Sequence, residues 1–316
     1  MRDALCASEP GVGLIIQWMV LALLALSAWL VLRTGRVSLG QQAYFGLGAY
    51  SSAMVTVMAQ GSLGMGLCVA MGCAALAAWV VGALLRPLSG LPYAMASLAV
   101  AEMCRLGLSS WNWQVQQADG RWVGPQGVQG FRQIRWVFEQ QMSQQAYLAV
   151  AGALLAVCVL GLWWMQRCRL GMALQAVGLD ATLAQAQGLA VENLRWGAQT
   201  FAGAVAGLAG ALYAHQMTYV EPAIFDAMLG VHAVGYALLG GLATPWGPLL
   251  GSGFDLGLLE ATRLFEGWRM VIFGGLIALF LRWRPRGLLD EDTLHHLSRI
   301  FFLFFSRKSH ERHTPA

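Results

Sequence analysis

Residues 12–32 read VGLIIQWMVLALLALSAWLVL, an uninterrupted apolar run that ends at Arg33. A helix of this length rises about 30 Å, which is the thickness of the hydrocarbon core of a bilayer. The run is too long for the apolar core of a signal peptide, and no small-residue cleavage site follows it. We therefore expect residues 12–32 to form a retained first membrane helix.

Further apolar runs follow, and the longer ones approach the roughly 20 residues that cross a bilayer. These runs are Val37–Ala59, Leu63–Leu85, Leu91–Ser110, Gln145–Met165, Trp196–Met217, Met228–Ala243, Leu249–Thr262 and Met270–Trp283. The two runs beside residues 240–248 are shorter, which leaves open two tilted spans or one broken, re-entrant helix. Together the runs predict an all-α integral membrane protein with about 8–9 transmembrane helices.

Composition excludes a soluble domain. The chain is 57% hydrophobic and only 11% charged, whereas soluble domains contain about a quarter charged residues. The net charge of +4 does not indicate nucleic-acid binding, because the basic residues lie mostly beside apolar runs. The six cysteines fall mostly inside or beside the apolar runs without metal-ligand spacing, so we expect packing residues, no metal site and no cofactor.

Basic residues beside the runs predict the orientation, since cytoplasmic loops carry an excess of Lys and Arg. If the first helix runs inward, the following arginines fall inside: Arg33, Arg36, Arg86, Arg167, Arg169, Arg195, Arg282, Arg284 and Arg286. This pattern favours an external N-terminus and a cytoplasmic C-terminus. We expect a transmembrane domain over residues 1–290 and a cytoplasmic tail over 291–316.

Two connections are long. The external one, residues 111–143, is rich in Trp, Gln and Gly, which suits the membrane surface. The internal one, residues 166–195, is rich in helix formers and almost uncharged between its flanking arginines. A short helix in a groove of another protein explains this composition, and a helix lying on the lipid surface explains it equally well.

Catalytic patterns are missing from the sequence, which contains no GxxxxGK[ST], HExxH or GxSxG. Ionisable residues inside the runs are few. Glu102 and Arg105 are spaced to pair with each other on one helix, and Asp255 could line a pathway. Ion-coupled carriers usually need buried acids, so we expect a passive conduit, not an enzyme, driven by another subunit.

Several motifs carry a family resemblance. Residues 37–50 (VSLGQQAYFGLGAY) resemble the SLGQaaFxGxGAY signature of permeases from branched-chain amino acid ABC importers. The same family's later motifs are similar to residues 203–212 (GAVAGLAGAL), 219–225 (YVEPAIF), 240–251 (GGLATPWGPLLG) and 284–288 (RPRGL). The motifs occur in the family's order. The long external loop and the overall length look more like the M-type permease than its shorter H-type partner.

The resemblance implies a bacterial inner-membrane location and four kinds of contact: a second, H-type permease, two cytoplasmic ATP-binding subunits, a periplasmic substrate-binding protein and membrane lipid. It also assigns residues 166–195 to the loop that couples to an ATPase. The positions that match the family's pattern there are Gly171, Ala173, Leu174, Ala176, Asp180, Ala181, Gly188 and Leu189. The family's arginines fall on Met172 and Gly178, which puts the electrostatics of docking in doubt.

The remaining motif residues are expected to shape the conduit by helix packing rather than to bind substrate. They are Ser38, Gly40, Gln41, Gly46, Gly48, Tyr50, Gly207, Gly210, Gly240, Gly241, Pro245 and Gly247. For the break at 240–248 the sequence leaves a hinge and a simple re-entry open.

The function that follows is a permease subunit of an ATP-driven importer for branched-chain or related hydrophobic amino acids, working by alternating access. A urea or short-amide importer is the alternative within the class. An ion-coupled secondary transporter is the rival from another class, and the lack of a catalytic constellation argues against a membrane enzyme.

Overall fold

The computed structural model describes residues 10–116, 122–132, 134, 136–261, 274–275 and 282. Its α-helices are α1 (Pro10–Leu32), α2 (Gln41–Ala53), α3 (Leu63–Leu84), α4 (Leu91–Ser110), α5 (Trp136–Glu139), α6 (Gln144–Arg167), α7 (Arg169–Leu179), α8 (Ala181–Ala186), α9 (Val191–Met217), α10 (Ala227–Gly240) and α11 (Trp246–Ala261). Most of the predicted run 270–283, the 284–288 motif and the tail lie outside the described residues.

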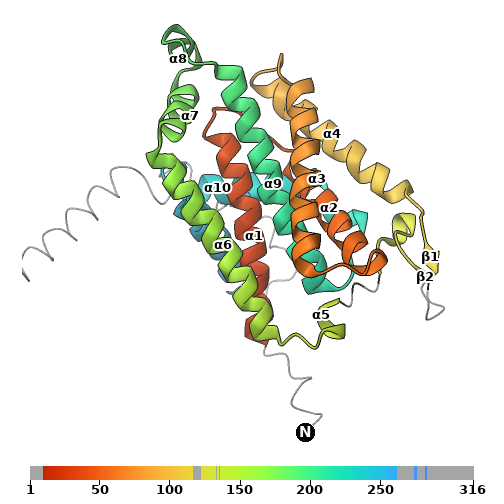
Figure 1. Cartoon of the computed structure of the whole chain (residues 1–316). Helices are drawn as coiled ribbons and strands as arrows, with labels where there is room; N and C mark the ends of the chain where they lie inside the picture. The colour runs from red at the N-terminus through yellow and green to blue at the C-terminus, as the bar shows by residue number, and fades with distance from the viewer. Residues whose placement is uncertain are drawn as a thin grey trace, which may run out of the picture.

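The chain folds into a helical bundle around α9, which packs against α1, α2 and α3 (Figure 1). One end of the bundle carries α7 and α8, and the opposite end carries α5 and the short strands β1 (Val115–Gln116) and β2 (Trp122–Val123). The α7–α8 end also gathers Arg33, Arg36, Arg86 and Arg195: Arg33 bonds Gln175, Arg36 bonds the Arg86 carbonyl, and Arg195 bonds the Thr34 carbonyl. The four arginines lie at one end of the bundle, as the predicted topology requires. Which side of the membrane this end faces stays a prediction.

Among the residues that the structure describes, three helices are long and apolar enough to cross a membrane by length and composition: Gly11–Leu32, Leu63–Leu84 and Gln144–Arg167. Helices α3 and α6 begin at serine caps, because the Ser62 and Ser143 hydroxyls accept the backbone N–H of the third residue along. The prediction of a mostly helical protein with several apolar helices is confirmed. The count of 8–9 spans stays a prediction.

The second apolar run is not one continuous helix, contrary to a simple reading of its hydropathy. Residues 36–40 are irregular, and α2 begins only at Gln41, inside the bundle. It ends in a π-helical turn, η1 (Met54–Met58). The irregular backbone is satisfied by a side chain, since the Leu39 N–H donates to the Ser97 hydroxyl at 3.0 Å. An irregular segment inside a bundle of membrane helices is tolerated where protein surrounds it.

Helices α10 and α11 form a hairpin, and the choice between two tilted spans and one re-entrant segment stays a prediction. Gly247 packs against Gly240, and Gly251 packs against the carbonyl of Tyr236, so the helices run antiparallel. The turn between them is held to α1 by Trp29, whose indole donates to the Leu242 carbonyl at 3.2 Å. Asp226 caps the start of α10 through the Leu229 N–H.

The described part of the external loop folds back onto the bundle. Phe131 and Val220 exchange backbone hydrogen bonds of 2.7 and 3.0 Å, which joins the loop to the turn after α9. Phe131 and Phe225 both stack edge-on against Tyr50. The loop therefore closes this end of the bundle with a buried aromatic cluster, while Trp113 and Trp122 remain exposed.

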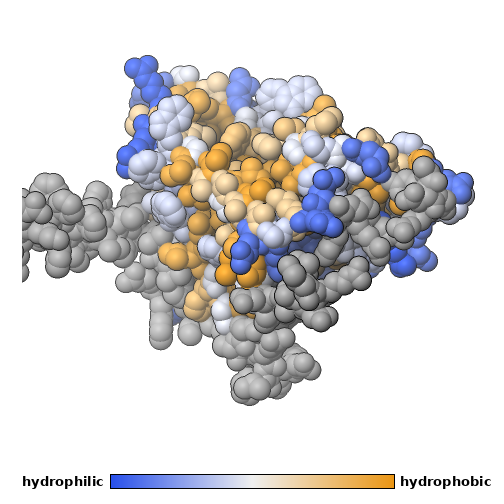
Figure 2. Space-filling model, turned by 60° about the horizontal axis from the view of Figure 1, so that its bottom comes forward, coloured by the Kyte–Doolittle hydropathy of each residue, from blue (hydrophilic) through white to orange (hydrophobic). Residues whose placement is uncertain are grey.

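The outer surface is strongly apolar. Figure 2 shows hydrophobic residues over a broad area, with hydrophilic residues in separate patches. Helices α3, α4 and α6 contribute exposed large side chains such as Leu76, Leu91, Met103 and Trp164, all more than half exposed. Such a surface is unsuited to water and suits lipid or other membrane helices.

The close contact between α2 and α9 generates the first prediction. A Cβ on Gly48 would collide with the backbone of Gly207, so Gly48→Ala should cost about 1–3 kcal/mol through overpacking. Gly161→Ala is the matched control, because nothing lies within 4 Å of a Cβ there. Thermal unfolding in detergent should show a lower midpoint for Gly48→Ala alone, and equal midpoints would contradict the packing.

Candidate functional site

The predicted coupling loop forms two short helices, α7 and α8, joined at Asp180. The Asp180 carboxylate caps α8 by accepting the Thr182 and Leu183 N–H groups at 2.9 and 3.0 Å. These bonds, with one from the Thr182 hydroxyl, lower the pKa of Asp180 below its ordinary value. The Asp180 carboxylate thus already has a structural use, although the resemblance places it at a docking position.

The loop has a buried face and an apolar exposed face. Gly171 and Leu174 are buried, Ala173, Ala176, Ala181 and Leu189 are half-buried, and Asp180 and Gly188 are exposed. Four large apolar side chains point outward: Leu170, Met172, Leu179 and Leu183 are 57–82% exposed. In a water-facing loop this apolar face would be unfavourable unless another surface covers it.

A close backbone contact ties α7 to the end of α1. A Cβ on Gly178 would collide with the carbonyl oxygen of Arg33, so only glycine fits at this position. The Arg33 guanidinium donates to the Gln175 side chain at 3.1 Å. The family's pattern has an arginine at the position of Gly178. In this chain the guanidinium of Arg33, directly after α1, contacts the loop there.

An ion cluster joins the start of α9 to the residues before α2. Arg36 donates to Glu192 at 2.9 Å, and Arg195 donates to the same carboxylate at 3.1 Å. Arg36 also donates to the Arg86 carbonyl, and Arg195 to the Thr34 carbonyl. Because Arg36 is only 6% exposed, its charge depends on Glu192 for compensation.

The predicted conduit residues are all buried within the chain. Residues 38–50 of the first motif lie against α9, where Gly48 meets Gly207 and Gly210 meets Phe45. Gly240, Gly241, Pro245 and Gly247 lie apart from them at the α10–α11 turn. The structure therefore brings residues 37–50 and 203–212 together and leaves residues 240–251 at a separate place in the bundle.

Two adjacent glutamines at the start of α2 are buried without full hydrogen bonding. Gln41 Nε2 and both amide atoms of Gln42 have no partner among the described residues, and both side chains are 0% exposed. An unpartnered buried polar group costs about 1–3 kcal/mol. By contrast, Gln199 bonds to both Tyr44 and Tyr93. Our sequence reasoning names Gln41 but misses Gln42, although two consecutive amides inside an apolar run are a usable signal.

Other ionisable groups inside the helices have partners. Glu102 and Arg105 pair at 2.7 Å, which confirms the expected i,i+3 contact. Asp255 accepts the Tyr236 hydroxyl at 2.7 Å and is buried between α10 and α11. That position gives Asp255 a role in joining the hairpin.

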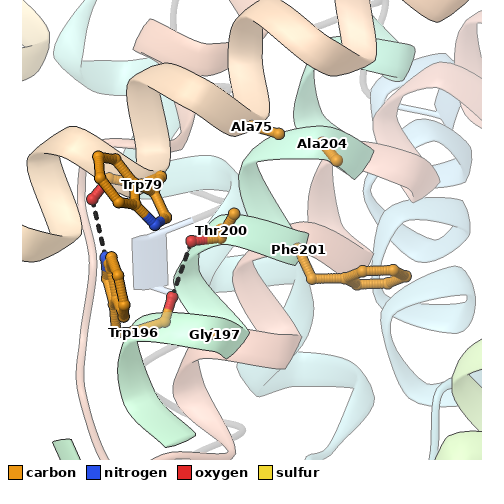
Figure 3. Close-up of a pocket in the computed structure, with 7 residues that line it drawn as sticks. All are labelled: Ala75, Trp79, Trp196, Gly197, Thr200, Phe201 and Ala204. Atoms are coloured by element: carbon orange, nitrogen blue, oxygen red, sulfur yellow. Dashed lines mark hydrogen bonds between the residues drawn. The ribbon is translucent and has the colours of Figure 1, made fainter. Parts of the chain in front are cut away.

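An apolar hollow of about 430 Å³ lies on the surface between α3 and α9 (Figure 3). The indole of Trp196 donates to the Trp79 carbonyl at its edge, and Phe201 points away from the two tryptophans. Ala75 and Ala204 line the remaining side. The hollow opens outward from the bundle, so it is not part of an enclosed path.

The contacts that hold the coupling loop escape sequence reasoning. Arg36 and Glu192 are separated by 156 positions, and Arg33 and Gln175 by 142. No local spacing signals either pair. Their arginines attract attention in the sequence only as topology determinants.

Loss of the Glu192 charge should destabilise the α7–α8 end. Glu192→Gln leaves the buried Arg36 without its counter-charge. It should lower the free energy of unfolding by about 1–3 kcal/mol, a value between the costs of breaking an exposed ion pair and a buried one. The control is Glu102→Gln, whose ion pair joins residues of one helix only. Thermal unfolding at pH 7 compares the two, and an equal effect would rule out a special dependence on Glu192.

A family model described as "Branched-chain amino acid transport system / permease component" matches residues 12–281. The high-affinity branched-chain amino acid transport system permease proteins LivM of Escherichia coli (strain K12) and Salmonella typhimurium (strain LT2) are each 31% identical over 123 residues, 39% of this chain and 29% of the relative. The autoinducer 2 import system permease protein LsrC of Klebsiella pneumoniae is 28% identical over 172 residues, 50% of this chain and 48% of the relative.

The aligned part thus spans less than a third of the LivM relatives and about half of LsrC. No solved structure matches significantly. The family match nevertheless covers most of the chain, including α1 to α11. The chain therefore belongs to the family of permease components of branched-chain amino acid transport systems.

Proposed function

We propose that this chain is the membrane permease of an ATP-driven importer for branched-chain or related hydrophobic amino acids, located in a bacterial inner membrane. The family match over residues 12–281 carries the proposal. The LivM relatives, named for branched-chain amino acid transport, favour that substrate class. LsrC is named for autoinducer 2 import, which favours as the second candidate a related permease for a different small solute.

In this proposal α7 and α8 couple to a cytoplasmic ATPase. The apolar face of Leu170, Met172, Leu179 and Leu183 supports docking in a protein groove, because these exposed side chains need a cover. A second permease of H-type, two ATP-binding subunits and a periplasmic substrate-binding protein complete the assembly. Residues 111–143 then face the periplasm, and residues 291–316 face the cytoplasm.

The proposed route of coupling runs from α7 through Arg33 and Arg36 to the start of α2. Movement of α7 would act on Arg33 through Gln175 and the contact at Gly178. Arg36, fixed to Glu192 at the start of α9, leads directly into residues 37–40 and α2. A push on the loop would therefore reach the irregular segment inside the bundle, which is where alternating access would change the conduit.

Co-purification is the decisive test of the function. The tagged chain, isolated from native membranes, should bring a second permease and two ATPases, with ATP hydrolysis stimulated by the binding protein. Uptake of branched-chain amino acids by the reconstituted complex should require ATP. A chain that purifies alone and transports in response to a proton or sodium gradient would overturn the proposal in favour of a secondary transporter.

Removing the apolar face should release the ATPases. The double variant Leu179→Ser/Leu183→Ser loses two large exposed side chains, 82% and 59% exposed, without changing the buried face. We expect at least a tenfold drop in co-purified ATPase, since interface anchors dominate binding. Val128→Ser, at a 77% exposed position of the external loop, is the control. Wild-type recovery from the double variant would instead favour a helix lying on lipid.

The cap of α8 gives a separate prediction. Asp180→Ala should speed hydrogen exchange of the Thr182 and Leu183 amides, whereas Asp180→Asn should preserve most protection because Asn also caps helices. Since the folded pKa of Asp180 is lowered, its stabilising effect is complete above the ordinary value and disappears as the pH falls through the lowered pKa. Exchange is measured at pH 7 by mass spectrometry, and equal rates in both variants would contradict the cap.

A further inference from the structure

The start of α2 combines three features that a purely structural element does not need. The helix begins inside the bundle after a break, and Gly40 at its N-cap provides no side-chain hydrogen bond. The next two residues, Gln41 and Gln42, are wholly buried and keep unpartnered amide atoms in the described part of the chain. Buried polar side chains inside a membrane protein are costly and mark pathways for polar solutes.

The two amides lie where α1, α2 and α10 meet. Gln41 faces Ser27 of α1 at 3.4 Å, and Gln42 lies against Gly230 of α10, where its Oε1 occupies the space that a Cβ on Gly230 would need. The Ser27 hydroxyl donates to the Leu24 carbonyl at 2.6 Å and to Gln41 Oε1 at 3.4 Å, so Gln41 Nε2 is the atom that lacks a partner among the described residues. Whichever way the Gln41 amide is turned, one of its polar atoms stays without a partner.

The chemistry of these groups suits a zwitterion. The unpartnered Nε2 atoms of Gln41 and Gln42 are donors, and the N-terminus of a helix favours negative charge. Both features suit a carboxylate. The unpartnered Oε1 of Gln42 is an acceptor and suits an ammonium group. Discontinuous membrane helices bind charged solute groups at their inner ends by the same physics.

We propose that Gln41 and Gln42, at the inner end of α2, contact the carboxylate and ammonium groups of an amino acid as it passes through the bundle. The inference rests on the proposed transport function and adds a contact site to it. Selection of the side chain is left to other groups, because the two amides recognise only the part that all amino acids share.

The test uses Gln41→Met and Gln42→Met in the complete complex, reconstituted in proteoliposomes with the binding protein and ATP. Met keeps the length of Gln and removes its amide. We expect at least a tenfold loss of L-leucine imported per ATP hydrolysed. We also expect an unchanged or higher unfolding temperature, because no internal hydrogen bond of the Gln42 amide is lost.

Gln199→Met is the matched control. It removes a buried amide that has two partners, so it should lower the unfolding temperature. If Gln41→Met and Gln42→Met import leucine normally, the amides have only internal or water contacts and the site proposal is wrong. The proposal is equally wrong if uptake falls only together with the unfolding temperature, as in Gln199→Met. A wild-type complex that imports no branched-chain amino acid would overturn the transport function and the site together.

Discussion

The structure depends on one constraint: a backbone that leaves the helical form inside an apolar bundle must still have its polar groups bonded. In residues 38–40, the Leu39 N–H donates to the Ser97 hydroxyl of α4 and the Gly40 N–H to the Ser38 hydroxyl. Farther along α2, the contact of Gly48 with Gly207 lets α9 approach closely. The segment before α2 is therefore held by α4, and α2 itself is held by the small residues of α9.

The same irregular segment links the two functional regions. Its first residues reach the α7–α8 end, where Arg36 is fixed to Glu192 and Arg33 to Gln175. Its last residue, Gly40, opens α2 and precedes the two buried glutamines. The backbone contact between Gly178 and Arg33 packs α7 directly against the start of this segment, so a movement of α7 would displace it. This continuity gives the proposed coupling a physical path.

Sequence reasoning locates most helices well, because apolar length is a strong signal. The predicted runs Leu63–Leu85 and Leu91–Ser110 agree with α3 and α4 to within one residue. The run Val37–Ala59 hides its break, since the Val-Ser-Leu-Gly of residues 37–40 is as apolar as a helix would be. Hydropathy averages over side chains and carries no information on the backbone. The pairing of Arg36 with Glu192 is hidden for another reason, because it joins residues far apart in the chain.

The sequence by itself determined the class of protein, the family and the apolar segments, because a bilayer demands long apolar runs and the motifs keep the family's order. Only the tertiary structure decided where α2 begins, that Asp180 caps α8, and that Gln41 Nε2 and the Gln42 amide find no partner among the described residues. These features depend on contacts between helices distant in sequence, and neither composition nor periodicity encodes which hydrogen bonds such contacts leave unmade.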